Sequence, residues 1–242
     1  DGLSLTLNDG DFVTVIGGNG AGKSTLLNTI AGTFSVDSGS ITIDGEDITD
    51  LPEQKRARFL GRVFQDPMMG TAADMWIEEN MALAAHRGEH RGLRWAISPA
   101  DRENFRKLLS ELDLGLEERL SSKVGLLSGG QRQALTLLMA VMKKPKVLLL
   151  DEHTAALDPK TAAKVLELSD RFVEEGNLTT LMVTHNMKDA IAHGNRLIMM
   201  NAGKIVFDIS GEEKKRLTVD DLLHAFTLST AEEFANDRIL LS

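Results

Sequence analysis

The sequence contains no cysteine, no internal repeat and no low-complexity stretch. The absence of cysteine excludes disulfides, cysteine-ligated zinc, iron–sulfur clusters and thiol nucleophiles. The absence of repeats disfavours solenoids and tandem arrays. No apolar run approaches the roughly 18 to 20 residues that span a bilayer, and no charged-then-apolar signal sequence opens the chain. We therefore expect the protein to be cytoplasmic by default. The chain begins at Asp1 rather than at methionine, so we expect a preceding segment to be missing.

What is present describes an ordinary globular protein. The 242 residues include 27 Lys+Arg against 36 Asp+Glu, a net charge of −9, and 42% are hydrophobic. This length suits one domain, 1–242, with room for a subdomain. The acidic balance argues against binding along the phosphate backbone of nucleic acid.

Short apolar segments alternate with segments of helical spacing. The predicted strands are 3–7 and 12–16, which we expect to form a hairpin, then 40–45, 62–65, 147–150, 179–184 and a hairpin through Ala202-Gly203. The predicted helices include one around 26–31 with Gly32 after its end, one that begins after Ser128, 159–174 and a short one after Asn186. Such alternation predicts an α/β fold with a largely parallel sheet and ligands at the carboxyl ends of its strands.

Residues 68–125 differ from the rest because they are rich in helix formers. Candidate helices lie at 77–86, 99–112 and 117–120, and we interpret the segment as an inserted helical subdomain. Residues 211–242 form a C-terminal helical extension to which we assign no function.

A glycine-rich loop follows the strand at 12–16. Its sequence, Gly17-Gly18-Asn19-Gly20-Ala21-Gly22-Lys23-Ser24, fits the phosphate-binding pattern G-x-x-x-x-G-K-[ST] between a strand and a helix. Glycines let backbone N–H groups turn inward, Lys23 neutralises phosphate charge, and the Ser24 hydroxyl can ligate Mg²⁺. An incidental glycine-rich turn is the weaker alternative. The loop predicts phosphate binding without naming the reaction.

A second segment, Leu127-Ser128-Gly129-Gly130-Gln131, narrows the function. Ser128 with Gln131 three residues later is also a plain capping box, a structural helix start. A serine hydroxyl, two glycine N–H groups and a helix N-terminus nevertheless make a second anion site. Two phosphate-binding segments far apart in one chain suggest a nucleotide held between two copies.

With these motifs in place, the chain from about Gly2 to Asp208 resembles the ATP-binding cassette ATPases. The family order is the phosphate loop, Gln65, Leu127–Gln131, the strand ending at Asp151 with Glu152, then Ala156-Leu157-Asp158 and His185. The resemblance implies a RecA-like P-loop NTPase core with an antiparallel β edge and an inserted α-helical subdomain. It also implies a head-to-tail homodimer, or a paired cassette, with two ATP molecules at the interface.

The resemblance further assigns roles to single residues. It implies that Gly17 to Thr25 bind ATP, that Leu127 to Gln131 bind it in trans, and that Asp158 serves communication across the dimer. Ser24, Gln65 and Asp151 are the implied Mg²⁺ residues. Glu152 would polarise the attacking water, with His185 at the γ-phosphate. For Asp151, His185 and Gln65 the structural alternatives are a helix cap, a hydrogen-bonded strand end and an ordinary turn residue.

The chain departs from the family pattern at several positions. His153 stands where the family usually has proline, and Ala155 where serine is common. The aromatic residue that stacks on adenine in the family precedes Leu3 and is not in this sequence, and Phe12 is expected to be a core residue.

Because no membrane-spanning segment is present, a transport function needs separate permease subunits. Candidate contacts with a permease are Met68, Met69, Met75, Trp76 and the Arg-rich patch 86–95. Core filling is the favoured explanation of the methionines, and a solvated loop that of the patch.

The leading hypothesis is the ATPase subunit of an importer at the inner face of the plasma membrane, served by a solute-binding protein and related to amino-acid uptake systems. An exporter subunit comes second, and a soluble ATPase that controls assembly of a protein complex, similar to those of iron–sulfur assembly, comes third.

Overall fold

The computed structural model describes residues 2–88 and 97–228 and contains a six-stranded sheet in the order β4-β5-β6-β1-β7-β8. The strands are β1 (Phe12–Gly17), β4 (Leu60–Val63), β5 (Val147–Asp151), β6 (Thr179–Val183), β7 (Arg196–Asn201) and β8 (Lys204–Ser210). Every neighbouring pair is parallel except β7 and β8 at one edge. Because β5, β6 and β1 are covered on both faces, they carry nearly continuous apolar runs. The predicted parallel sheet is therefore confirmed.

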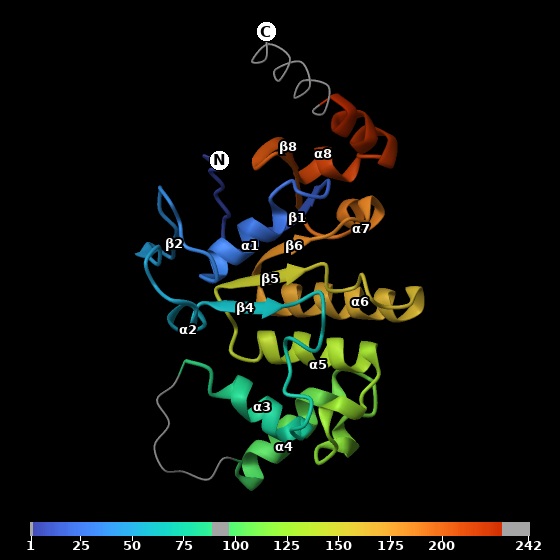
Figure 1. The fold of residues 1–242 in the computed structure, drawn as a ribbon. Helices are drawn as coiled ribbons and strands as arrows, with labels where there is room; N and C mark the ends of the chain where they lie inside the picture. The colour runs from blue at the N-terminus through green and yellow to red at the C-terminus, as the bar shows by residue number, and fades with distance from the viewer. Residues whose placement is uncertain (1, 89–96, 229–242) are drawn as a thin grey trace.

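Helices cover the sheet and extend beyond it. They are α1 (Lys23–Ala31), α2 (Glu53–Arg56), α3 (Ile77–Ala85), α4 (Pro99–Ser110), α5 (Gly129–Val141), α6 (Pro159–Gly176), α7 (Met187–Ala192) and α8 (Gly211–Lys215), with short 3₁₀ turns η1 (Glu117–Arg119) and η2 (Val124–Leu126). Residues 219–228 are also helical. A small hairpin of β2 (Thr42–Ile43) and β3 (Glu46–Asp47) stands apart from the main sheet. Figure 1 shows α3 and α4 at the end of the molecule opposite β8, with α5 between them and the sheet.

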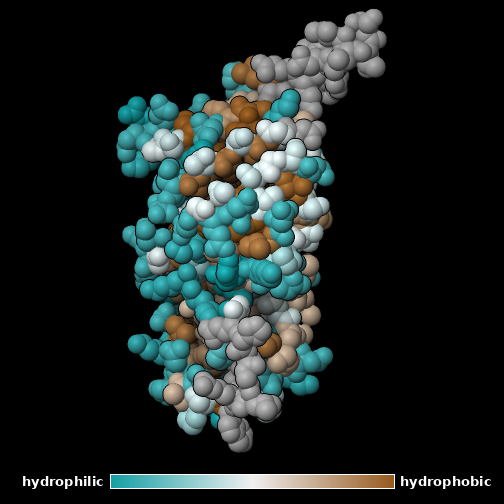
Figure 2. All heavy atoms as spheres, turned by 90° about the vertical axis from the view of Figure 1, so that its left-hand side faces the viewer, coloured by the Kyte–Doolittle hydropathy of each residue, from teal (hydrophilic) through white to brown (hydrophobic). Residues whose placement is uncertain are grey.

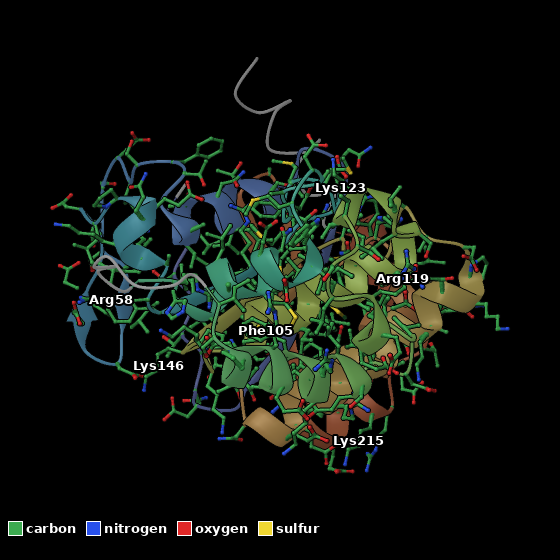
Figure 3. All side chains as sticks on the ribbon, turned by 90° about the horizontal axis from the view of Figure 1, so that it is seen from below. Arg58, Phe105, Arg119, Lys123, Lys146 and Lys215 are labelled. Atoms are coloured by element: carbon green, nitrogen blue, oxygen red, sulfur yellow. The ribbon has the colours of Figure 1, made fainter. Side chains whose placement is uncertain are left out.

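The helices at this end pack around buried apolar residues. This cluster is continuous with the core on one face of the sheet. Phe105 and Leu109 of α4 are buried together with residues of α3 and α5. Seen from this end, Phe105 lies in the middle of the molecule, whereas Arg58, Arg119 and Lys146 lie toward its rim (Figure 3). The apolar stripe of α5 thus joins the helices of 68–125 to the sheet.

The first predicted strand is wrong. Residues 3–7 form no strand, although Leu3, Leu5 and Leu7 are half-buried against the core while their neighbours are exposed. The alternation in the sequence therefore reports burial on one side without a hydrogen-bonded partner strand. One contact that holds the segment is a hydrogen bond from Arg196 Nη1 to the carbonyl oxygen of Thr6, at 2.7 Å.

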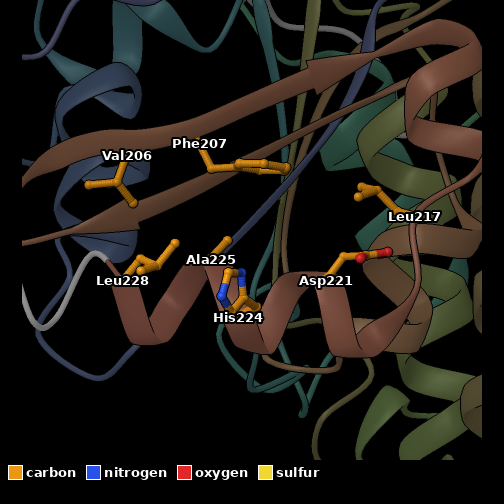
Figure 4. Close-up of a pocket in the computed structure, with 7 residues that line it drawn as sticks. All are labelled: Val206, Phe207, Leu217, Asp221, His224, Ala225 and Leu228. Carbon is orange, nitrogen blue, oxygen red and sulfur yellow. The ribbon is translucent and has the colours of Figure 1, made fainter.

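A groove lies between β8 and the helix at 219–228 (Figure 4). It is lined by Val206, Phe207, Leu217, Asp221, His224, Ala225 and Leu228. None of the residues predicted for phosphate binding or catalysis lines it. Residues 229–242 of the predicted C-terminal extension lie outside the described residues.

On the face shown in Figure 2, hydrophilic residues dominate the middle and apolar residues gather in the upper part. Among residues 2–88 and 97–228, no helix has the length and apolar character needed to cross a bilayer.

Candidate functional site

The loop between β1 and α1 has a backbone that only glycine fits at two points. Gly17 has φ +155°, and a Cβ there would lie 2.3 Å from the carbonyl oxygen of Met200. Gly22 caps α1 with φ +97° and would bring a Cβ to 3.3 Å from Gly203 Cα. The loop therefore lies tightly against the end of β7 and the turn after it. Glycine is therefore required at both positions of the loop that leads into the N-terminus of α1, where the phosphate cradle is predicted.

Lys23 is held inside this loop. Its side chain is buried, and Nζ donates to the carbonyl oxygens of Gly17 and Gly18 at 2.7 and 3.0 Å. Ser24 and Thr25, the next two residues of α1, are exposed. The ammonium and the helix N-terminus thus supply positive potential at one place, and the hydroxyls remain accessible there.

Asp151 is the last residue of β5 and Glu152 follows it, beside the carboxyl end of β6. Glu152 has φ +44°, a left-handed conformation that costs a residue other than glycine about 1 to 2 kcal/mol. Its backbone N–H donates to the carbonyl oxygen of Val183 at 3.0 Å, which ties the turn to β6. The turn brings Glu152 Oε2 to 3.3 Å from His185 Nδ1. Two residues predicted to flank the γ-phosphate are therefore neighbours.

The carboxylate of Asp151 is mostly buried. Burial raises the pKa of this group above its ordinary value, Arg62 opposes that shift and Glu152 adds to it. Arg62 Nη2 lies 3.7 Å from Asp151 Oδ2. A partly buried carboxylate at the end of a strand is thus held next to a permanent cation.

The donor set fits Mg²⁺. Asp151 offers carboxylate oxygens, Ser24 a hydroxyl, and α1 packs against β5, which carries Asp151. Within the described ranges 2–88 and 97–228, no three His, Asp or Glu side chains form a metal-binding group. Mg²⁺ is held by one or two protein oxygens together with water and substrate phosphates, so the set is sufficient for a nucleotide-bound ion.

The second predicted segment begins α5. Ser128 is the N-cap: its hydroxyl accepts from the N–H of Gln131 at 3.2 Å, and Gln131 Oε1 accepts from the N–H of Ser128 at 3.2 Å. The capping box is therefore present, and the exposed Ser128 remains accessible. Gly130 lies so close to α6 that a Cβ would come within 2.0 Å of Thr161 Cγ2. The role of the segment as an anion site stays a prediction.

Asp158 caps α6, the helix that supports Gly130. Its Oδ1 accepts from the N–H of Thr161 at 3.1 Å, and these bonds lower the pKa of Asp158. Residues 152–158 therefore connect the end of β5, with its acidic residues, to α6, which contacts α5 at Gly130. His153, in the middle of that connection, is buried, with Nε2 2.9 Å from Ser169 Oγ. Burial is the main cause that lowers the pKa of His153 to about 4. The histidine that replaces the family's proline is thus a neutral anchor on α6.

Gln65 follows β4 and is exposed. The sequence did not indicate its support: Gln133 of α5 donates from Nε2 to the carbonyl oxygen of Phe64 at 3.1 Å. Arg132, the preceding residue of α5, donates to the carbonyl oxygens of Val124 and Gly125 and contacts Met68. Arg62 was missed as well, although an arginine inside the apolar run of β4 is a recognisable signal.

The favoured explanation of the methionines as core residues is wrong for two of them. Met68 and Met69 are exposed, at 46% and 69%, as is Trp76 at 43%. Met75 is half-buried. Exposed apolar side chains thus follow Gln65. In the Arg-rich patch, residues 89–95 lie outside the described residues.

Comparisons with known proteins agree on one family. Residues 1–155 match the family model described as ABC transporter. The tyrosine transport ATP-binding protein of Clostridioides difficile is 50% identical over 226 residues, 93% of this chain and 90% of that protein. The spermidine/putrescine import ATP-binding protein PotA of Haemophilus influenzae is 39% identical over 211 residues, 87% of this chain but 54% of that protein, so the chain spans about half of its length.

Solved structures with a similar fold include ATP-binding cassettes. The ADP conformation of an ATP-binding cassette of an ABC transporter has a TM-score of 0.74 at 29% identity, covering 88% of this chain and 85% of that one. A dimeric cassette in a post-hydrolysis state bound to ADP and Pi has a TM-score of 0.73 at 29% identity, covering 86% and 88%.

Proposed function

The chain belongs to the ABC transporter family, and from this premise we propose that it is the ATP-hydrolysing subunit of an uptake system that moves a small solute through separate permease subunits. The observation that carries the proposal is the 50% identity, over nine-tenths of both chains, to a tyrosine transport ATP-binding protein. The similarity to PotA, an import protein, also favours uptake over export. An assembly ATPase has no such support among these relatives.

ATP binds, in this proposal, at the loop from Gly17 to Thr25. Backbone N–H groups and Lys23 hold the phosphates, for which the glycine-dependent backbone of the loop and the buried ammonium are the support. Ser24 and Asp151 hold Mg²⁺, with Gln65 completing its surroundings. When bound, the metal neutralises phosphate charge.

Hydrolysis is a transfer of the γ-phosphoryl group to water. Glu152 orients the attacking water and acts as general base toward it. Its carboxylate can reach the water because the side chain is 22% exposed at the end of β5. His185, 3.3 Å from that carboxylate, orients it and contacts the γ-phosphate. The residues position groups and stabilise charge without a covalent intermediate.

The working unit is a dimer in which Ser128 and its glycines cap the γ-phosphate bound by the partner. Support comes from the exposed N-terminus of α5 and from the similarity to a dimeric cassette. Asp158 lies in the segment between Glu152 and α6 and conveys the state of one site to the other. An isolated monomer therefore hydrolyses ATP slowly.

Residues 68–125 form the helical subdomain that meets a permease. The exposed Met68, Met69 and Trp76 provide apolar contact area for it. The protein thus works at the cytoplasmic face of the membrane. The solute is an aromatic amino acid such as tyrosine, delivered by a solute-binding protein.

The test is purification of the protein from native membranes, with its bound subunits identified, followed by uptake assays after deletion of the gene. We expect a polytopic permease to co-purify and tyrosine uptake to fall, while spermidine uptake is retained. Purification without a permease, together with unchanged uptake of both solutes, contradicts the proposal. Loss of spermidine uptake alone replaces the proposed solute and keeps the transport function.

A further inference from the structure

Arg62 lies on β4, which pairs with β5 at one side of the sheet (Figure 1). In the β4–β5 ladder it is opposite Leu149, two residues before Asp151. Only 13% of its side chain is exposed. A buried arginine beside an apolar strand must find partners for its charge and its donors.

The partners of the guanidinium belong to two different elements. Nη2 donates to Asn28 Oδ1 of α1 at 2.6 Å, and Nη1 donates to Thr33 Oγ1 just after α1 at 3.4 Å. The ring of Phe64, next to Gln65, lies 4.5 Å from the guanidinium carbon. Nε is buried and has no hydrogen-bond partner. Hydrogen bonds to α1 and contact with an aromatic ring therefore fix where the charge is.

The relation of Arg62 to Asp151 is different in kind. Nη2 lies 3.7 Å from Asp151 Oδ2, too far for a hydrogen bond yet close for two mostly buried charges. Arg62 thus acts on Asp151 through its charge, while its hydrogen bonds go to α1. Because arginine stays protonated, this charge is permanent.

We propose that Arg62 is a positioning residue that sets the metal requirement of nucleotide binding, because its fixed charge neutralises Asp151 and competes with a divalent cation for that carboxylate. The inference rests on the proposed function, in which Asp151 serves Mg²⁺. A cation that approaches Asp151 must share its negative charge with the guanidinium and is repelled by it. Removing the charge therefore strengthens metal binding, whereas removing a mere brace between α1 and β4 weakens it or leaves it unchanged.

The experiment uses Mn²⁺ in place of Mg²⁺ and ADP as nucleotide, so that no hydrolysis is needed. Free Mn²⁺ is followed by electron paramagnetic resonance during titration into the full chain with saturating ADP. The variants are Arg62→Met, which removes the charge at similar length, Arg62→Lys, which keeps it, and Asn28→Ala, which removes a hydrogen bond and leaves the charge.

We expect Arg62→Met to lower the dissociation constant of Mn²⁺ about three- to tenfold, with Arg62→Lys and Asn28→Ala within twofold of the wild type. An unchanged or raised constant in Arg62→Met overturns the inference, as does a drop of equal size in Asn28→Ala. If Arg62→Met does not fold, Arg62→Gln serves as the neutral variant with the same two outcomes. A wild type that binds neither ADP nor Mn²⁺ refutes the proposed function instead, because no metal-dependent site then exists.

Discussion

The N-termini of α1 and α5 contain similar residues. They differ in which side chains interact with them. Gly22 precedes α1, whereas α5 opens with Gly129 and Gly130, and the first N–H groups of a helix favour an anion. At α1 a buried lysine from the same segment supplies the charge. At α5 the capping box engages the N–H groups of Ser128 and Gln131, and no basic residue lies in the segment Leu127–Gln131.

This difference shows what each end can do alone. In the proposed function, the loop before α1 binds phosphate within one chain, because Lys23 supplies the charge there. The start of α5 is a capped helix end, and in the proposed function it meets a nucleotide only when the partner subunit brings one. The comparison therefore predicts that the two ends respond differently to substitution.

The largest effect on ATP binding is expected at Lys23. Lys23→Met removes the ammonium that the loop holds over its own carbonyl groups and should weaken ATP binding about a hundredfold or more. Equilibrium dialysis with labelled ATP measures it. The fold should persist, because the lysine's bonds are local to the loop. Binding within tenfold of the wild type would show that the loop before α1 does not dominate, and would break the comparison.

The next effect concerns hydrolysis. Glu152→Gln keeps the shape of the side chain and removes its negative charge, so we expect hydrolysis to fall by about 10² to 10⁴ while ATP still binds. Gel filtration with ATP should then show a persistent dimer. A variant that hydrolyses ATP at the normal rate removes Glu152 from its proposed position in the mechanism.

A substitution at Ser128 distinguishes its role as a helix cap from its proposed role in binding nucleotide in trans. Ser128→Ala should cost about 1 kcal/mol of stability as a lost cap, and should also reduce hydrolysis about ten- to a hundredfold with ATP binding by the monomer unchanged. Steady-state hydrolysis and urea unfolding measure the two effects.

The matched control is Ser98→Ala at α4. Ser98 has the same type of capping box, with its hydroxyl accepting from the N–H of Asp101 at 3.1 Å, and it lies in the helical end. Equal stability loss in both variants with equal hydrolysis would leave Ser128 as a cap only.

The smallest effect depends on pH and concerns the support of α5. The pKa of His153 is about 4 in the folded protein against 6.5 as its ordinary value, so the unfolded chain takes up the proton first as the pH falls. The stability that depends on neutral His153 is complete above pH 6.5 and is lost toward pH 4. At pH 5.5 the loss is about 1.4 kcal/mol.

Urea unfolding at pH 7.5 and 5.5 tests this in the wild type and in His153→Asn, which cannot titrate. The drop in unfolding free energy between the two pH values should be smaller by about 1.4 kcal/mol in the variant. Identical drops would mean that His153 is protonated without cost, and that the segment 152–158 is not anchored as described.

The sequence was sufficient for features that depend on local pattern. The runs in β1, β5 and β6, the end of α1 at Gly32 and the cap at Ser128 are each written in a few neighbouring residues. The prediction of a strand at 3–7 is wrong because a strand needs a partner strand, and the local pattern carries no information about one. Exposure of Met68 and Met69 also depends on packing between distant segments.

The residues of the candidate site also fall into two groups, those predicted from local sequence and those that depend on distant contacts. The motif residues were predicted, and the structure brings Glu152 and His185 together. Arg62, Gln133 and the buried pairing of His153 with Ser169 were not foreseen, because each depends on contacts across 16 to 89 positions of the chain. Their role as supports therefore needed the three-dimensional arrangement.

One helix, α5, is capped by Ser128 and, within its second turn, binds the carbonyl group of Phe64, next to Gln65, through Gln133. A continuous helix transmits a push along its length without a separate rearrangement. A movement that starts at Gln65 should consequently reach the N-terminus of α5, the proposed γ-phosphate cap, in the same kinetic phase. Signals recorded by probes at these two places would then rise and decay together, as one relaxation.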